Sequence, residues 1–181
     1  MEKYIIVTLL KGPAKRMQEG LLREISEKFG VALGISQDPP AHITLKQPFE
    51  TDDITYMMSF LEDFCATLEA FTYEIEGFDH FDDEVIFMDV VDQDGPLRDV
   101  YDELISEIRD MKKIKMGPID GIGHFHATVA RHDIAEKFDE IWEFVSSKEI
   151  SFEQTFDNIS ILKLDNGKWK LVQEVKIKKR K

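Results

Sequence analysis

The chain has 181 residues, of which 43% are hydrophobic, and its formal net charge is −13. This length suits one domain or two small lobes that share a core. The acidic balance argues against a broad electrostatic contact with long duplex DNA or RNA, whose backbones carry one negative charge per phosphate. It leaves room for a small nucleotide or an RNA end in a local basic pocket.

The hydrophobic runs and the cysteine content bear on the location of the protein. No apolar run approaches the roughly 20 residues that a membrane helix needs. The run at 4–10 is too short for such a helix and lacks the cleavage pattern of a signal peptide. Cys65 is the single cysteine, so a disulfide framework cannot form within the chain. These features predict a mature cytoplasmic protein that does not bind membranes.

The first half of the sequence alternates between strand-like and helix-like segments. Strands are predicted where β-branched and aromatic residues dominate, and helices where apolar residues recur at three- and four-residue spacing. Asp52 or Asp53 is suited to cap the second helix. The expected elements are a strand at 4–10, a helix at 13–29, a strand at His42, a helix at 57–68 and a strand at 71–78.

The second half repeats this order. Pro96 favours the first turn of a helix, Asp133 is suited to cap another, and the Asp-Asn-Gly run at 165–167 predicts a tight turn between strands. The expected elements are a strand at 85–91, a helix at 96–108, a strand at His126, a helix at 134–145, and strands at 152–164 and 169–177. The order strand–helix–strand–helix–strand therefore occurs twice, which predicts one bilobal domain over 1–181 with approximate repeat halves 1–83 and 84–181.

A short motif falls on the second strand of each half. The sequence reads His-Ile-Thr-Leu at 42–45 and His-Ala-Thr-Val at 126–129. Side chains alternate along a strand, so the histidine and threonine of each motif point to one face and the hydrophobic residues point to the other. If the lobes are related by a two-fold axis, two imidazoles and two hydroxyls converge on one cleft.

These four side chains suit phosphodiester chemistry. A histidine titrates near neutral pH, so one of His42 and His126 can take a proton while the other, protonated, gives one to a leaving oxygen. The hydroxyls of Thr44 and Thr128 can donate hydrogen bonds to phosphate oxygens. No metal or other cofactor is needed for this scheme. A 2′,3′-cyclic phosphate would be opened in this way, and the reverse reaction would join an RNA end.

The two motifs, at matching places in a repeated element order, resemble the two-histidine (2H) phosphoesterase superfamily, which contains LigT-like 2′-5′ RNA ligases and cyclic phosphodiesterases. The resemblance implies an α+β fold of two pseudo-symmetric lobes, each an antiparallel-rich sheet with helices outside, flanking a central cleft. It implies catalytic roles for His42 and His126. The family often has a basic residue after a motif, which makes Lys46 and Arg131 candidate phosphate contacts. Lys46 is in phase with His42, whereas Arg131 is out of phase with His126 unless the strand bulges or ends.

His124 leaves a second chemistry open. It lies two residues before His126, and His-x-His on a strand is a recurring metal-ligand spacing. His132 or a distant carboxylate would then supply a third ligand. This alternative leaves the first motif unexplained, so we expect no metal and assign His124 to the rim of the cleft as a substrate contact. His80 and His132 are flanked by charged or turn residues and are expected at the surface.

A non-catalytic function is the main alternative to an enzyme. The same cleft would recognise a nucleotide or a phosphorylated RNA end without turnover, because binding and proton transfer use the same residue types. A purely structural adaptor would leave the paired polar faces without a purpose. The expected partner in either case is a small nucleotide or RNA end, and a monomer is expected because the repeat supplies both half-sites.

Overall fold

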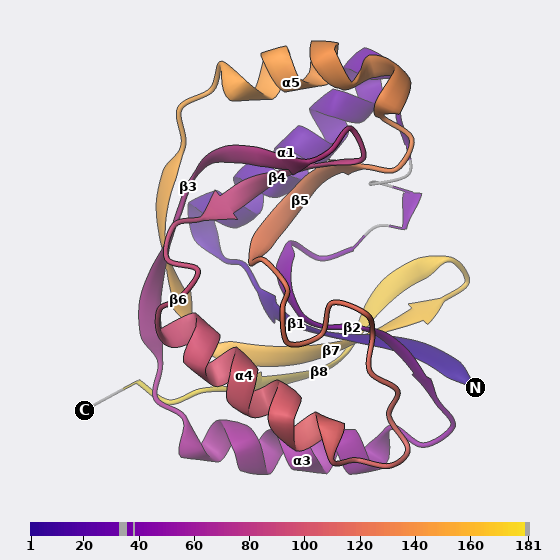
Figure 1. The fold of residues 1–181 in the computed structure, drawn as a ribbon, viewed down its shortest axis with the longest axis vertical. Coiled ribbons are helices and arrows are strands. Elements are labelled where there is room, and N and C mark those ends of the chain that lie inside the picture. Colours follow the sequence, from indigo (N-terminus) through magenta and orange to yellow (C-terminus); the bar gives the residue numbers. More distant parts are fainter. Residues whose placement is uncertain (33–35, 38, 180–181) are drawn as a thin grey trace.

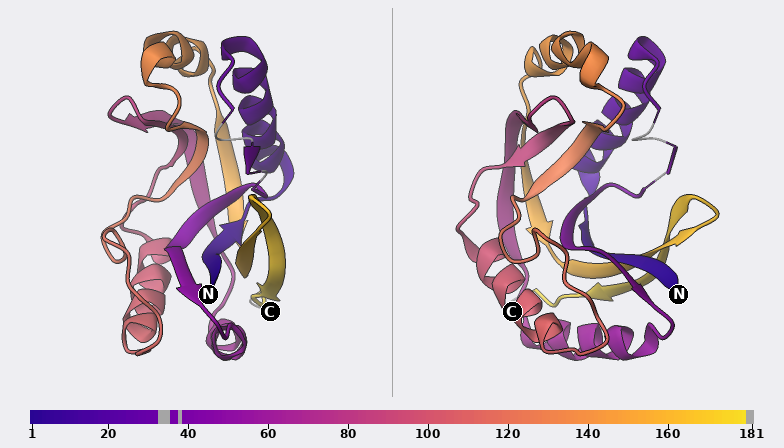
Figure 2. Two further views of the ribbon diagram at one scale, coloured as in Figure 1. Left: turned by 90° about the vertical axis from the view of Figure 1, so that its right-hand side faces the viewer. Right: turned by 45° about the vertical axis from the view of Figure 1, so that its right-hand side comes forward.

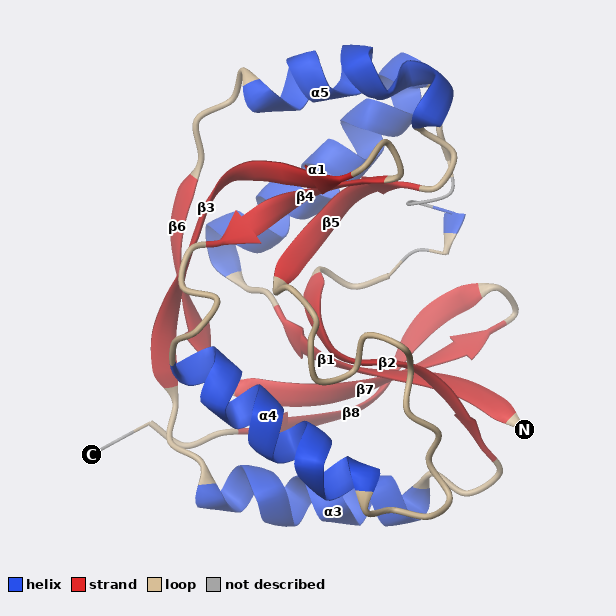
Figure 3. Ribbon diagram, viewed as in Figure 1, coloured by secondary structure: helices blue, strands red, loops and turns tan. Residues whose placement is uncertain are grey.

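The computed structural model describes residues 1–32, 36–37 and 39–179. Within these residues the strands form two four-stranded sheets, and every pair of neighbouring strands is antiparallel. Figure 1 and Figure 3 show the helices at the two outer ends of the molecule and the strands between them. The predicted α+β fold with two lobes and helices outside is therefore confirmed.

The first sheet has the strand order β2-β1-β7-β8. Its strands are β1 (Glu2–Leu9), β2 (His42–Thr51), β7 (Asn158–Asp165) and β8 (Lys168–Lys176). The second sheet has the order β5-β4-β3-β6. Its strands are β3 (Phe71–Phe81), β4 (Val85–Val90), β5 (His126–Arg131) and β6 (Ser151–Phe156). The two motif strands, β2 and β5, are thus edge strands of different sheets, and they contact each other.

The helices are divided between the lobes. The helical elements are α1 (Gly12–Phe29), α3 (Thr55–Thr67), α4 (Pro96–Arg109), η1 (Ala135–Lys137) and α5 (Phe138–Ser146). Helix α1 packs against β5 and β6, α5 packs against β3, and α3 packs against β7 and β8. Figure 2 shows α1 and α5 side by side at one end of the molecule, with α3 and α4 at the other.

The lobes do not coincide with the halves of the sequence. The predicted halves meet at a tight turn with Asp82 at a φ of 47°, and this turn joins β3 to β4 within one sheet. Strand β3 comes from the first half but lies in the second sheet, whereas β7 and β8 come from the second half and complete the first sheet. The segment 152–164, predicted as one strand, is broken at Asp157, where the chain passes from β6 in one sheet to β7 in the other.

The ends of the elements follow local chemistry in most places. Gly30 ends α1 in the left-handed conformation, with a φ of 71°. Asn166 and Gly167 both have positive φ and form the predicted β7–β8 turn. The carboxylate of Asp53 accepts the N–H of Thr55 at 3.0 Å, at the start of α3. Asp133 does not cap α5 as predicted, because its carboxylate instead accepts the N–H of Ala32 at 2.8 Å.

Candidate active site

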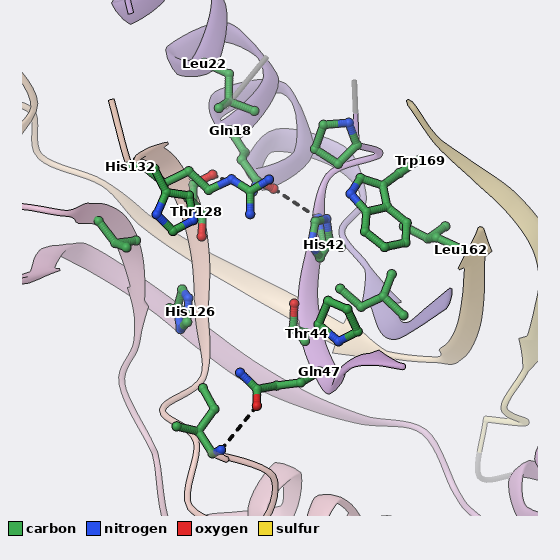
Figure 4. Close-up of a pocket in the computed structure, with 16 residues that line it drawn as sticks. Gln18, Leu22, His42, Thr44, Gln47, His126, Thr128, His132, Leu162 and Trp169 are labelled. Carbon is green, nitrogen blue, oxygen red and sulfur yellow. Dashed lines mark hydrogen bonds between the residues drawn. The ribbon is translucent and has the colours of Figure 1, made fainter. Parts of the chain in front are cut away.

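The two motif strands bring their histidines and threonines to one cleft between the sheets. His42 and Thr44 of β2 and His126 and Thr128 of β5 line the same cavity of about 220 Å³ (Figure 4). The convergence predicted from the repeat is therefore present. The two histidines lie 84 positions apart in the chain.

Alternation along each strand explains why the polar side chains face the cleft. Ile43 and Leu45 are 0% and 1% exposed, and Ala127 and Val129 are likewise 0% and 1% exposed. These residues pack into the main hydrophobic core, so burial of their apolar surface fixes the face of each strand. The intervening histidines and threonines are only partly buried.

Both imidazoles are held in the same way by a backbone carbonyl two residues earlier. His42 Nδ1 lies 2.6 Å from the carbonyl oxygen of Pro40, and His126 Nδ1 lies 2.6 Å from that of His124. A carbonyl oxygen can only accept, so each Nδ1 carries the proton. In the neutral form, each Nε2 is therefore the ring nitrogen with a free lone pair, as a general base requires.

Burial holds both histidines in their neutral form. The pKa of His42 is lowered to about 4, chiefly by burial; the bond to Pro40 opposes this, and the charge of Arg131 and that of His126 when protonated add to the lowering. Burial also lowers the pKa of His126 from its usual 6.5; the bond to the His124 carbonyl opposes this lowering, and the nearby His124 ring adds to it less strongly. A bound phosphate would oppose these effects, because its negative charge favours the imidazolium form.

A bulge in β2 removes Lys46 from the cleft. Thr44 pairs with Val7 and Lys46 pairs with Ile6, so Leu45 is the extra residue in β2. The bulge reverses the alternation: Lys46 points into the protein, and Gln47 lines the cleft beside His42 and Thr44. The prediction that Lys46 contacts phosphate is wrong, because it assumed an unbroken two-residue period.

Lys46 instead forms a buried ion pair with Asp120. The Lys46 ammonium lies 2.7 Å from the Asp120 carboxylate, and the two side chains are 0% and 1% exposed. The same carboxylate accepts the backbone N–H groups of Gln47 at 2.9 Å and Gly117 at 2.5 Å. The pair therefore fastens the 115–123 loop to β2 and places Ile119 at the cleft wall.

A matching bulge in β5 brings Arg131 into the cleft. Thr128 pairs with Phe87 and Ala130 pairs with Ile86, so Val129 is the extra residue. Arg131 thereby shares a face with Thr128 and lines the cavity with it. The bulge is thus the irregularity on which the predicted phosphate contact of Arg131 depended. One Arg131 N–H group donates to the side-chain oxygen of Gln37 at 2.5 Å.

His124 does not line the main cleft with the other candidates. Its Nε2 lies 2.6 Å from the carboxylate of Asp89 and 3.1 Å from the amide nitrogen of Gln93. These partners fix the orientation of the ring, which lines a small cavity with Thr44 and His126, so its role as a substrate contact stays a prediction. Its backbone carbonyl also orients the His126 ring.

The described residues do not assemble a cluster of three or more His, Cys, Asp or Glu side chains that would suit a metal ion. His132, considered as a third ligand with His124, lies at the cleft instead. It was expected only at the surface, and it is indeed exposed, with a φ of 64° just after β5.

Sequence reasoning did not identify several cleft residues. Gln18 of α1 and Trp169 of β8 both line the cavity, and their segments show no motif that links them to the histidines. Trp169 donates to the same Gln37 oxygen as Arg131, at 3.2 Å. Gln47 had a signal, because aligning His-Ile-Thr-Leu-Lys-Gln with His-Ala-Thr-Val-Ala-Arg places it opposite Arg131.

The fold agrees with solved structures of phosphoesterases. A crystal structure of a phosphoesterase has a TM-score of 0.66 and 13% sequence identity to this chain, and covers 98% of it and 99% of its own chain. Escherichia coli LigT complexed with 3′-AMP has a TM-score of 0.61 and 13% identity, with the same coverage. At this identity the likeness shows the fold alone, which is LigT-like.

Comparison of the sequence with family models identifies the family of the chain. A family model described as the 2′-5′ RNA ligase superfamily matches residues 15–168. The chain belongs to this superfamily, which confirms the resemblance drawn from the two motifs. A curated protein from Geobacillus sp. (strain WCH70), provisionally named a phosphoesterase, is 26% identical over 136 residues, or 72% of this chain and 74% of that protein. Family and fold support a function of the phosphoesterase and RNA-ligase type. No described helix is long and apolar enough to cross a membrane.

Proposed function

We propose that this protein is a metal-independent phosphoesterase that acts on 2′,3′-cyclic phosphate or 2′-5′ phosphodiester bonds of nucleotides or RNA ends. The observation that carries the proposal is the matched pair His42 and His126. Both line one cleft, and both have Nδ1 fixed by a carbonyl so that Nε2 remains for proton transfer. This is the arrangement that acid–base catalysis at a single phosphorus needs.

The reaction on a cyclic phosphate balances with these two groups and water. One neutral imidazole takes a proton from water as the water oxygen bonds to phosphorus. The other, as imidazolium, gives its proton to the ribose oxygen as the bond between that oxygen and phosphorus breaks. The product is a phosphomonoester, and the two rings exchange protons with solvent before the next turnover. Thr44, Thr128 and Arg131 donate to the non-bridging oxygens, where charge accumulates.

The charges and the walls of the cleft favour a small substrate. Among the described residues that line the cavity, Arg131 alone is permanently charged, since Lys46 is buried in its ion pair and Gln47 is neutral. A single arginine matches the one negative charge of a phosphodiester. Trp169 and Leu162 form an apolar wall beside His42 that suits a nucleobase (Figure 4). The complex of LigT with 3′-AMP supports a nucleotide ligand for this fold. Both half-sites come from one chain, so we propose a monomer.

The proposal is tested by incubating the purified protein, with EDTA present, with 2′,3′-cyclic nucleotides and 2′-5′-linked dinucleotides. We expect turnover that His42→Ala and His126→Ala each reduce by about 10²–10⁴-fold, the usual contribution of a general acid or base. His80→Ala is the matched control, because that ring packs between Phe138 and Trp142 away from the cleft. Activity that vanishes with EDTA and returns with added metal would contradict the metal-independent scheme.

One observation favours the alternative of a non-catalytic binder. Both histidines have lowered pKa values, so at pH 7 the neutral form of each predominates in the free protein and little imidazolium is present to act as the acid. A binder needs no such group, whereas an enzyme must gain the proton when substrate binds. Tight binding of 3′-AMP without turnover across the substrate panel would establish the binder.

A further inference from the structure

Gln18 lies between the two motif strands but belongs to neither. It is in α1, which follows β1 of the first sheet yet packs against β5 of the second. Its side chain is 2% exposed and lines the floor of the cleft. Figure 4 shows it beside His42, on the side of the cavity away from Gln47.

The amide of Gln18 connects β2 to β5. Its oxygen accepts the backbone N–H of His42 at 3.1 Å, and its nitrogen donates to the backbone carbonyl of Thr128 at 2.8 Å. Both strands are sheet edges, and edge strands carry backbone groups that no neighbouring strand pairs. β2 and β5 share no backbone hydrogen-bond ladder. The Gln18 side chain therefore supplies two hydrogen bonds between them, one at His42 and one at Thr128.

We infer that Gln18 is a positioning residue that sets the spacing of the two motif strands, and so of His42 and His126, across the cleft. This inference rests on the proposed acid–base function. Two groups that act on opposite sides of one phosphorus must keep a fixed separation, and a displacement of about 1 Å reduces a rate by about 10²-fold. The ring of each histidine is fixed to its own strand by its Nδ1 bond, so the distance between strands becomes the distance between rings.

Only an amide suits this place among side chains of this size. It presents an acceptor and a donor at one end, whereas a carboxylate at neutral pH only accepts and a methionine does neither. Gln18→Met therefore removes both bonds at nearly constant volume. Gln18→Glu keeps the bond from His42 and places a carboxylate against the carbonyl of Thr128.

Gln154 is a matched control. It is a glutamine that is 6% exposed, and its oxygen accepts the backbone N–H of Lys11 at 3.2 Å, which joins β6 of one sheet to the start of α1. It does not line the cleft. Gln154→Met thus removes a comparable buried amide and lowers the melting temperature without a reason to change the active site.

The first experiment compares kcat, KM and melting temperature for wild type and the three variants on a 2′,3′-cyclic nucleotide. We expect kcat to fall about 10²-fold in Gln18→Met and less than threefold in Gln154→Met, with similar losses of melting temperature. Gln18→Glu should retain more activity than Gln18→Met, and its pH–rate profile should move to higher pH, because a carboxylate beside His42 favours the imidazolium. The other charged or titratable groups that act on His42 are Arg131 and His126 of β5. Equal kcat values for Gln18→Met and Gln154→Met would overturn the inference.

A second experiment does not depend on turnover. The ring resonances of the histidines are followed by NMR while inorganic phosphate is added. In wild type and Gln154→Met, both rings should shift with one dissociation constant, whereas in Gln18→Met phosphate should bind at least tenfold more weakly. If Gln18→Met binds phosphate at least tenfold more weakly than wild type but wild type lacks turnover, the proposed function fails while the positioning role of Gln18 stands. If Gln18→Met binds phosphate as wild type does, the inference fails.

Discussion

Strands β2 and β5 begin with the same motif and contain a bulge at the same place, yet they end differently. After the bulge, β2 carries a buried Lys46 and a cleft residue Gln47, whereas β5 carries a buried Ala130 and a cleft residue Arg131. The two sides of the cleft thus share their imidazole and hydroxyl groups but differ in charge. The difference teaches that the positive side chain of β5 faces the cleft, whereas that of β2 holds a loop.

The largest expected effect comes from breaking the buried pair that β5 lacks. Lys46→Met leaves the Asp120 carboxylate buried without its counter-charge, so we expect the free energy of unfolding to fall by about 3–5 kcal/mol. Urea denaturation measures the change. Lys170→Met is the control, because its pair with Asp165 is exposed at 58% and 41% and should contribute under about 1 kcal/mol.

The double variant Lys46→Met/Asp120→Asn sharpens this test. It removes both charges and keeps an acceptor for the loop, so it should recover most of the lost stability. Equal stabilities of the single variant and wild type would show that the ion pair does not hold the loop to β2.

The next effect concerns the charge that β2 lacks. Arg131→Gln makes the two sides alike and removes charge-assisted hydrogen bonds to phosphate, each of which contributes about 1.5–3 kcal/mol. We expect kcat/KM for a cyclic nucleotide to fall about 10–100-fold, measured under the conditions of the wild-type assay. A loss below threefold would mean that Arg131 does not contact the substrate phosphate.

The converse change, Gln47→Arg, gives both sides a cation. We expect inorganic phosphate to bind about fivefold more tightly near pH 7.5, because a second charge in a partly solvated cleft adds about 1 kcal/mol to the attraction of a dianion. Isothermal titration calorimetry checks the affinity. Gln47→Leu is the control, since it also loses the 3.2 Å bond from the backbone of Ile119 but adds no charge. Weaker phosphate binding in Gln47→Arg than in Gln47→Leu would contradict the matched geometry of the two sides.

The smallest effect is a shift along the pH axis. The pKa of His42 is lowered to about 4 and that of His126 is also lowered, so the form with one proton between them is most populated below pH 6.5. The profile of kcat/KM, which reports the free enzyme, should therefore be bell-shaped with its maximum below pH 6.5. The maximum of kcat should lie at higher pH, because bound phosphate raises both pKa values. A maximum of kcat/KM above pH 7 would contradict the assignment.

The sequence was sufficient for the fold class and for four of the cleft residues. The paired motifs fixed the direction of His42, Thr44, His126 and Thr128, because apolar neighbours at alternate positions define the buried face. What followed each motif was not predictable, because a bulge depends on the register of the partner strand. Unbroken two-residue alternation predicts that Lys46 faces the cleft and that Arg131 faces away from it. The bulge in each strand reverses the alternation, so Lys46 is buried and Arg131 faces the cleft.

Other parts of the site depend on tertiary structure. Gln18 and Trp169 reach the cleft from a helix and a hairpin whose own patterns describe only helix and strand. The repeat also did not predict which strands share a sheet, because β7 pairs with β1 of the first half and brings its hairpin partner β8 into the same sheet. Sequence order indicates which elements form, and long-range pairing decides where they lie.

This pairing governs how the protein forms during its synthesis. Strand β1 is translated long before its partner β7, which begins at Asn158, so one edge of β1 stays open while the elements between them are made. An N-terminal fragment that stops at the β3–β4 turn would hold β3 without either of its neighbours. Completion of the second sheet therefore awaits β6, and completion of the first awaits the C-terminal β7–β8 hairpin, so ribosome-bound nascent chains that lack these strands would present open strand edges to chaperones.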